Sequence, residues 1–176
     1  MERQKIIQLL KENHSSFINY INDLTDEEFL FTNQQKWTAG QQLDHIYLAV
    51  RPVVLALSLP KLFTRFLFGK ANRESRTYED LVKKYLKKLE DGAKATGRFI
   101  PNTIALHQKE TICKALDRTT NALCSKIEKF TEQDLDKLIL PHPLLGKLTL
   151  REMLYFTIYH VGHHHEIAER NVKALH

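Results

Sequence analysis

Residues 149–170 read TLREMLYFTIYHVGHHHEIAER, and this stretch combines a helical pattern with four of the nine histidines of the chain. An α-helix turns by about 100° per residue, and on such a wheel the apolar side chains fill one continuous arc of about 200°. His160 and His164 lie inside this arc, one turn apart. His163 and His165 fall near its two edges. The segment therefore predicts a helix that buries a pair of imidazoles, which at this spacing can share one metal ion.

Length and composition favour an all-α fold in a single domain over residues 1–176. Hydrophobic residues make up 43% of the chain and charged residues 27%, while Gly and Pro number only six and five. These values are typical of a globular domain and unlike a turn-rich sandwich or barrel. No run shows period-two alternation over the length of a strand. Four main helices with short additional helices, packed as a four-helix bundle, are therefore expected.

The expected helices cover about residues 3–22, 38–59, 77–92, 103–130 and 149 onward, with a short helical piece after Leu24. Threonines followed three residues later by Gln or Glu, as at Thr38 and Thr149, predict capping boxes that start two of these helices. A bend is expected near Pro52 and a break at Pro60. The stretch 59–72 is expected to form an apolar and basic connector, 92–102 a loop, and 141–143 a turn.

Charge and cysteine content indicate a cytoplasmic protein without a membrane span, and nucleic-acid binding through the positive charge is the less favoured alternative. The net charge is +5, but Lys and Arg are dispersed, and the densest run (residues 83–88) alternates with apolar residues as on a solvated helix face. The N-terminus lacks a signal-peptide pattern, and the apolar stretch 53–68 is too short and too charged to span a bilayer. Cys113 and Cys124 stand about 16 Å apart along one predicted helix, too far for a disulfide.

A third histidine completes a candidate metal site. On the helix that begins after Thr38, His45 faces inward together with Ile46 and Val53, and the small Ala49 leaves space beside it. Antiparallel packing of this helix and the last one would bring His45 to the pair on the last helix. Three imidazoles with an open fourth position are typical of catalytic zinc, and they also suit nickel, copper or iron(II). Three separately satisfied core histidines remain the alternative.

Other metal and catalytic motifs are missing from the chain. A carboxylate-bridged di-iron bundle needs Glu-x-x-His pairs, and none is present. His165-Glu166-Ile167-Ala168-Glu169 begins like a zincin motif, but Glu169 stands where the second His is required. The chain also has no Gly-x-Ser-x-Gly, no phosphate-binding glycine loop and no Cys-x-x-Cys.

Two segments resemble the DinB-like (YfiT-like) superfamily. Residues 37–45, WTAGQQLDH, resemble the opening of the second helix of that family. Residues 142–149, HPLLGKLT, followed by His160-x-x-x-His164, resemble its closing segment, and the similarity covers nearly the whole chain. The resemblance implies a four-helix bundle in which His45, His160 and His164 bind one divalent metal ion. The run from His163 to His165 departs from the His-His-Arg frequent in the family, so substrate contacts are not carried over.

The resemblance also implies a reaction class. Characterised relatives include metal-dependent thiol transferases and isomerases that use a low-molecular-weight thiol, and others are described as metal-dependent hydrolases. We therefore expect an enzyme of the thiol S-transferase or hydrolase type, with zinc or nickel bound, a small electrophilic substrate and a low-molecular-weight thiol as candidate co-substrate. Asp44, His163 and Glu166 are candidates for its proton acceptor.

A non-enzymatic protein is the alternative. Its metal ion would be structural, or the bundle would act as an interaction module. The apolar residues of the stretch 59–68 motivate this alternative, because they would then form a homodimer contact or dock another protein.

Overall fold

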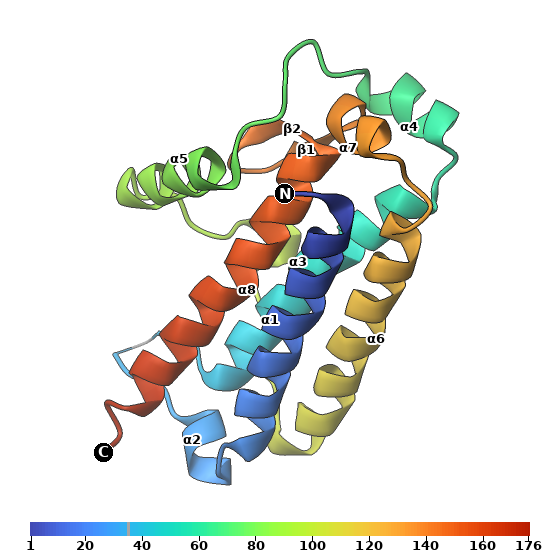
Figure 1. The fold of residues 1–176 in the computed structure, drawn as a ribbon. Coiled ribbons are helices and arrows are strands. Elements are labelled where there is room, and N and C mark those ends of the chain that lie inside the picture. The colour runs from blue at the N-terminus through green and yellow to red at the C-terminus, as the bar shows by residue number, and fades with distance from the viewer. Residues whose placement is uncertain (35) are drawn as a thin grey trace.

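The computed structural model describes residues 1–34 and 36–176, and its chain is mainly helical, as predicted (Figure 1). In chain order the α-helices are α1 (Arg3–Asp23), α2 (Asp26–Leu30), α3 (Ala39–Ser58), α4 (Lys61–Phe68), α5 (Tyr78–Glu90), α6 (Lys109–Ile127), α7 (Glu132–Lys137) and α8 (Leu150–Val172). The short elements are the 3-10 turns η1 (Gly97–Phe99) and η2 (Leu106–Gln108) and the strands β1 (Ile139–His142) and β2 (Gly146–Thr149).

The four longest helices surround the hydrophobic core. Helices α1 and α3 each contact both α6 and α8, and the four lie along one another in Figure 1. Each turns one apolar stripe inward, which is the arrangement that buries amphipathic helices. The fully buried centre of the core includes Ile6, Leu10, Phe17, Leu43, Ile46, Leu116, Leu123 and Leu154. The core thus fixes α3 and α8 next to each other.

Both predicted capping boxes are confirmed. Thr38 Oγ1 accepts a hydrogen bond from the Gln41 backbone N–H at 3.1 Å, and the Thr38 N–H donates to Gln41 Oε1 at 3.0 Å. Thr149 and Glu152 make the same pair of bonds at the start of α8, at 3.2 and 2.9 Å. Reciprocal bonds of this kind satisfy backbone N–H groups at a helix start that have no partner within the helix. They fix where the two histidine-bearing helices begin.

A β-hairpin before α8 corrects the expectation that the chain contains no strand. β1 and β2 pair antiparallel from Ile139 with Thr149 to His142 with Gly146. Each strand has four residues, and the buried positions of β1 do not alternate with exposed ones. Strands this short, with most side chains buried, do not produce the period-two pattern by which strands are found in sequence.

The end of α3 agrees with the prediction, whereas the start of α6 differs from it. Helix α3 continues through Pro52 and ends at Ser58, just before the break predicted at Pro60. Proline removes one helical hydrogen bond, and the burial of Val53 and Leu57 beyond it offsets that loss. Helix α6 begins at Lys109, later than predicted, after the 3-10 turn η2.

Part of the predicted connector is helical. Helix α4 follows Pro60, and its exposed face carries Leu62 and Phe66, whose exposed fractions are 79% and 83%. Among the described residues, no single helix is long and apolar enough to cross a membrane, and only α3 and α4 taken together, bent by 114°, meet that criterion.

Candidate metal centre

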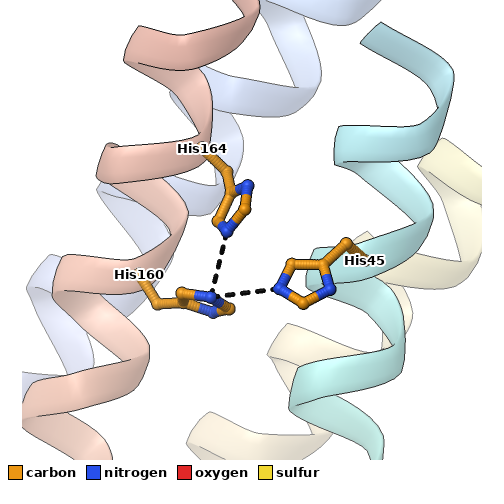
Figure 2. Close-up of side chains that lie close together, drawn as sticks. All are labelled: His45, His160 and His164. Atoms are coloured by element: carbon orange, nitrogen blue, oxygen red, sulfur yellow. Dashed lines mark hydrogen bonds between the residues drawn. The ribbon is translucent and has the colours of Figure 1, made fainter. Parts of the chain in front are cut away.

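Three imidazoles from two helices meet inside the fold, as the sequence predicted. Helix α3 supplies His45, and α8 supplies His160 and His164 (Figure 2). The Nε2 atom of His160 lies 3.2 Å from His45 Nε2 and 3.1 Å from His164 Nε2. One nitrogen from each ring lies within 4.8 Å of the other two, and each residue is 6% exposed. The three residues form a group that could hold one metal ion.

Hydrogen bonds on the far side of two rings determine which nitrogen faces the centre. His45 Nδ1 lies 2.7 Å from the carbonyl oxygen of Phe99, and His164 Nδ1 lies 2.5 Å from Gln42 Oε1. Both oxygens only accept hydrogen bonds, so Nδ1 carries the proton in each ring and Nε2 keeps its lone pair. Two lone pairs are therefore directed at His160.

A shared cation fits this arrangement better than hydrogen bonds alone. Neutral His160 has one N–H at most, and a single proton on its Nε2 cannot lie in line with the lone pairs of both His45 and His164. A cation bound by three Nε2 atoms uses all three lone pairs together. Donation of the second ring nitrogen to a carbonyl or amide oxygen is also the usual support of a metal-binding histidine.

Burial keeps the three rings in the form that binds metals. It lowers the pKa of His45 and lowers those of His160 and His164 well below the usual value for histidine. The mutual repulsion of the rings when charged lowers the pKa of His160 further. Neutral imidazole is the ligand form, so the centre is ready to bind a cation at neutral pH.

Aromatic rings hold the three imidazoles in place. The Trp37 ring lies with its centroid 5.0 Å from that of His45 and is stacked on His164 at 6.2 Å. The ring of Phe156 is stacked on His160 at 4.6 Å. Contacts on both helices therefore restrict ring rotation, which is a requirement for a preorganised site.

The three histidines line a cavity of about 800 Å³. Its walls are largely apolar and include Ile46, Val50, Val53, Ala56, Met153 and Phe156. The charged residues that line it are Lys36, Lys94 and Arg98, and no Asp or Glu of the described residues is among them. The cavity has the size of a small-molecule site and a positive charge bias even before a cation binds.

Of the three candidate proton acceptors, only His163 lies at the cavity. His163 lines the cavity, with its ring edge-on to Tyr85 at 5.9 Å and to His164 at 5.3 Å. Asp44 is buried, but its Oδ2 accepts hydrogen bonds from the backbone and side chain of Asn102 at 2.8 and 3.0 Å. Asp44 thereby holds the loop that follows Phe99. Neither it nor the exposed Glu166 is among the described residues that line the cavity.

Sequence reasoning missed several residues around the centre. Gln42 stands three residues before His45 on the same face of α3, and this spacing was the one available signal for it. The role of the Phe99 backbone carbonyl could not be read from the sequence, because every residue has a backbone carbonyl. Tyr85, which is buried and has its pKa raised to about 12 by that burial, reaches the cavity from α5. His142 also lines the cavity.

Comparisons with known proteins place the chain in a family. The family model of the DinB superfamily matches residues 9–168, which include α3, α8 and all three histidines of the centre. The comparison with curated proteins and the comparison with solved structures each found no match. The match covers most of the sequence and agrees with the mainly helical fold. The chain therefore belongs to the DinB superfamily.

Proposed function

We propose that this chain binds one divalent metal ion, zinc or nickel, through His45, His160 and His164 and uses it as an enzyme of the thiol S-transferase or hydrolase type. The observation that carries the proposal is the convergence of three Nε2 atoms at the wall of a small-molecule cavity. The packing of α1, α3, α6 and α8 also supports the four-helix bundle that the resemblance implies.

The surroundings of the centre favour catalysis over a structural role. Structural zinc sites are closed by four protein ligands, whereas catalytic sites have three protein ligands and an open position. A divalent ion held there would act as a Lewis acid and lower the pKa of water or of a thiol. Neutral imidazoles do not compensate its charge, and no carboxylate of the described residues lines the cavity. The site therefore favours an anionic partner such as a thiolate.

Other residues at the cavity would bind the electrophile and accept the proton. The apolar walls formed by Val50, Val53 and Met153 would hold the apolar part of a small electrophile and limit access of water. His163 is the proton acceptor that we favour, because it lies at the cavity. Burial lowers the pKa of His163, so the ring is neutral near pH 7 and able to take a proton.

Metal analysis tests the centre directly. We expect one zinc or nickel ion per wild-type chain after loading and none in His160→Ala. Gln42→Leu should keep the three ligands but bind the ion about tenfold to a hundredfold more weakly, because the proton on His164 Nδ1 loses its acceptor. His107→Ala is the matched control, since His107 is exposed. A wild type that stays metal-free after loading would contradict the proposal.

Activity is tested with the metal-loaded protein and a panel of thiols and electrophiles, with ester hydrolysis measured in parallel. We expect turnover that requires the metal, is lost in His160→Ala and shows a reduced kcat in His163→Gln with unchanged metal content. A structural metal ion is the second candidate. It predicts a large rise in Tm with metal but no exchange of water or binding of thiol at the ion.

A further inference from the structure

The tight turn between β1 and β2 determines the tautomer of His142. This residue ends β1, and its Nδ1 atom accepts hydrogen bonds from the backbone N–H groups of Leu144 and Leu145, both at 3.1 Å. A nitrogen that accepts two hydrogen bonds carries no proton. In the neutral ring the proton is therefore on Nε2, which makes that atom a hydrogen-bond donor.

His142 presents this donor at the cavity of the metal centre. The residue lines the same cavity as the three histidines. Its ring stands edge-on to Phe156, with centroids 4.3 Å apart, and Phe156 in turn is stacked on His160. His142 Nε2 has no hydrogen-bond partner in residues 1–34 and 36–176. One aromatic ring thus separates a donor of fixed tautomer from the metal ligands.

Comparison with His14 distinguishes His142 from an ordinary core histidine. His14 also lines the cavity, but its Nδ1 lies 2.7 Å from the carbonyl oxygen of Leu10, and its Nε2 is sealed inside the protein with no partner among the described residues. His142 Nε2 likewise has no partner in the described part of the chain, but unlike His14 Nε2 it is not sealed from solvent. A molecule in the cavity can therefore reach the donor on His142.

His142 stays neutral over a wide pH range. Burial, together with the nearby charge of Lys84, lowers its pKa to about 4. The Lys84 ammonium group is held by a hydrogen bond to the carbonyl oxygen of Leu145 at 2.8 Å. A second proton would have to enter at Nδ1, where two N–H groups already point. The ring consequently offers one N–H and does not act as a base.

We propose that the Nε2–H group of His142 binds a carboxylate oxygen of the small molecule that occupies the three-histidine centre, and that it thereby selects carboxylate-bearing ligands. The inference rests on the proposed function. It is supported by the charges at the cavity, where Lys36, Lys94 and Arg98 are present and no described residue contributes a carboxylate. The three imidazoles of the centre would then bind the metal ion through their lone pairs, while the imidazole of His142 binds the ligand through its N–H.

The substitution His142→Asn isolates the donor from the turn. Asparagine Oδ1 lies close to the place of histidine Nδ1 and accepts hydrogen bonds from backbone N–H groups two or three residues on, as in an Asx-turn. The variant therefore keeps the bonds to Leu144 and Leu145 and lacks a donor at the position of Nε2. We expect its Tm and its metal content to equal those of the wild type.

The test uses cobalt(II)-loaded protein, whose visible and near-ultraviolet bands report thiol binding. Wild type and His142→Asn are titrated with ethanethiol and with mercaptoacetate, 3-mercaptopropionate and 4-mercaptobutyrate, which carry a carboxylate at increasing distance from sulfur. We expect the wild type to bind at least one of these carboxylates more tightly than ethanethiol. In His142→Asn that carboxylate should bind about tenfold to a hundredfold more weakly, with ethanethiol unchanged.

The outcomes separate this inference from the proposed function. Absence of cobalt bands in the wild type would overturn the metal centre, and the inference about His142 would fall with it. Cobalt bands together with equal losses for ethanethiol and the carboxylate, or with no loss at all, would overturn the role of His142 alone. The role of His142 would also be overturned if the wild type bound none of the three mercaptocarboxylates more tightly than ethanethiol.

Discussion

At the scale of single residues, the buried histidines differ in what each ring nitrogen meets. His14 is not part of the three-histidine group, and its Nε2 has no hydrogen bond among the described residues. Burial lowers its pKa from 6.5 to about 4, against the smaller effect of the Leu10 carbonyl. The unfolded chain therefore binds a proton between pH 6.5 and 4 that the folded chain does not. Stability due to neutral His14 is complete above pH 6.5 and falls as the pH decreases toward 4.

This difference predicts a pH-dependent free energy of unfolding. In chelator, the metal-free wild type should lose up to ~3 kcal/mol through His14 between pH 7 and pH 4. His14→Leu should show a correspondingly flatter pH dependence, because leucine does not titrate. Urea unfolding at pH 7, 6 and 5 measures the slopes, with the exposed His107 replaced by Ala as control. Equal slopes in wild type and His14→Leu would contradict the prediction.

At the scale of elements, an ion-pair cluster around the buried carboxylate of Glu152 attaches the segment before α5 to the start of α8. The Glu152 side chain is fully buried, and its two oxygens accept bonds from the Arg73 guanidinium at 2.6 and 2.7 Å. Further bonds come from the Arg76 and Thr149 backbone N–H groups. Burial alone would raise the pKa of Glu152, but these donors together lower it to about 2. The stability from this carboxylate is complete above pH 4.5 and is lost as the pH falls toward 2.

Removal of this carboxylate should destabilise the protein strongly. We expect Glu152→Ala to lower the free energy of unfolding by about 3 kcal/mol at pH 7, because it leaves buried donors unpaired and removes half of the capping box. The ion pair between Lys114 and Glu110 on α6 provides the control. Both side chains are exposed, so Lys114→Ala should leave the stability unchanged. Urea denaturation compares the two variants. Similar losses of the free energy of unfolding in both would contradict the prediction that the cluster around Glu152 stabilises the protein more than an exposed ion pair does.

At the scale of the whole molecule, the three-histidine group joins two helices far apart in sequence. His45 and His160 are 115 residues apart, and α3 and α8 also meet through their apolar faces. An ion bound by both helices stabilises the folded chain and not the unfolded one. Metal binding should therefore raise the melting temperature of the whole chain.

Metal removal should lower the melting temperature. With free zinc at about 1,000 times Kd, the ion adds about 4 kcal/mol, which for a chain of this size raises Tm by about 8–16 °C. The chelator should reverse the increase. In His160→Ala zinc should have no such effect, while the exposed His107 replaced by Ala should respond as the wild type does. A zinc-dependent increase of equal size in His160→Ala would mean that the ion binds elsewhere.

Much of the helical fold and the three candidate metal ligands could be predicted because the signals are local. Helical period decides which residues share a face, so the sequence alone places His160 and His164 on α8 and His45 on α3 in the interior. The capping boxes likewise depend on residues three apart. The strands 139–142 and 146–149 escaped prediction because each has only four residues, and their buried and exposed positions do not alternate.

By itself, the sequence determined α1, α3, α5 and α8, the starts of α3 and α8 and the three inward imidazoles, since each follows from spacing along one helix. The tertiary structure alone decided the chemistry of the rings. It brought the Phe99 carbonyl and the Gln42 amide to His45 and His164, and it placed a neutral N–H donor of His142 at the same cavity. The physical reason is that a histidine tautomer depends on the group opposite each nitrogen, and packing between distant segments places that group.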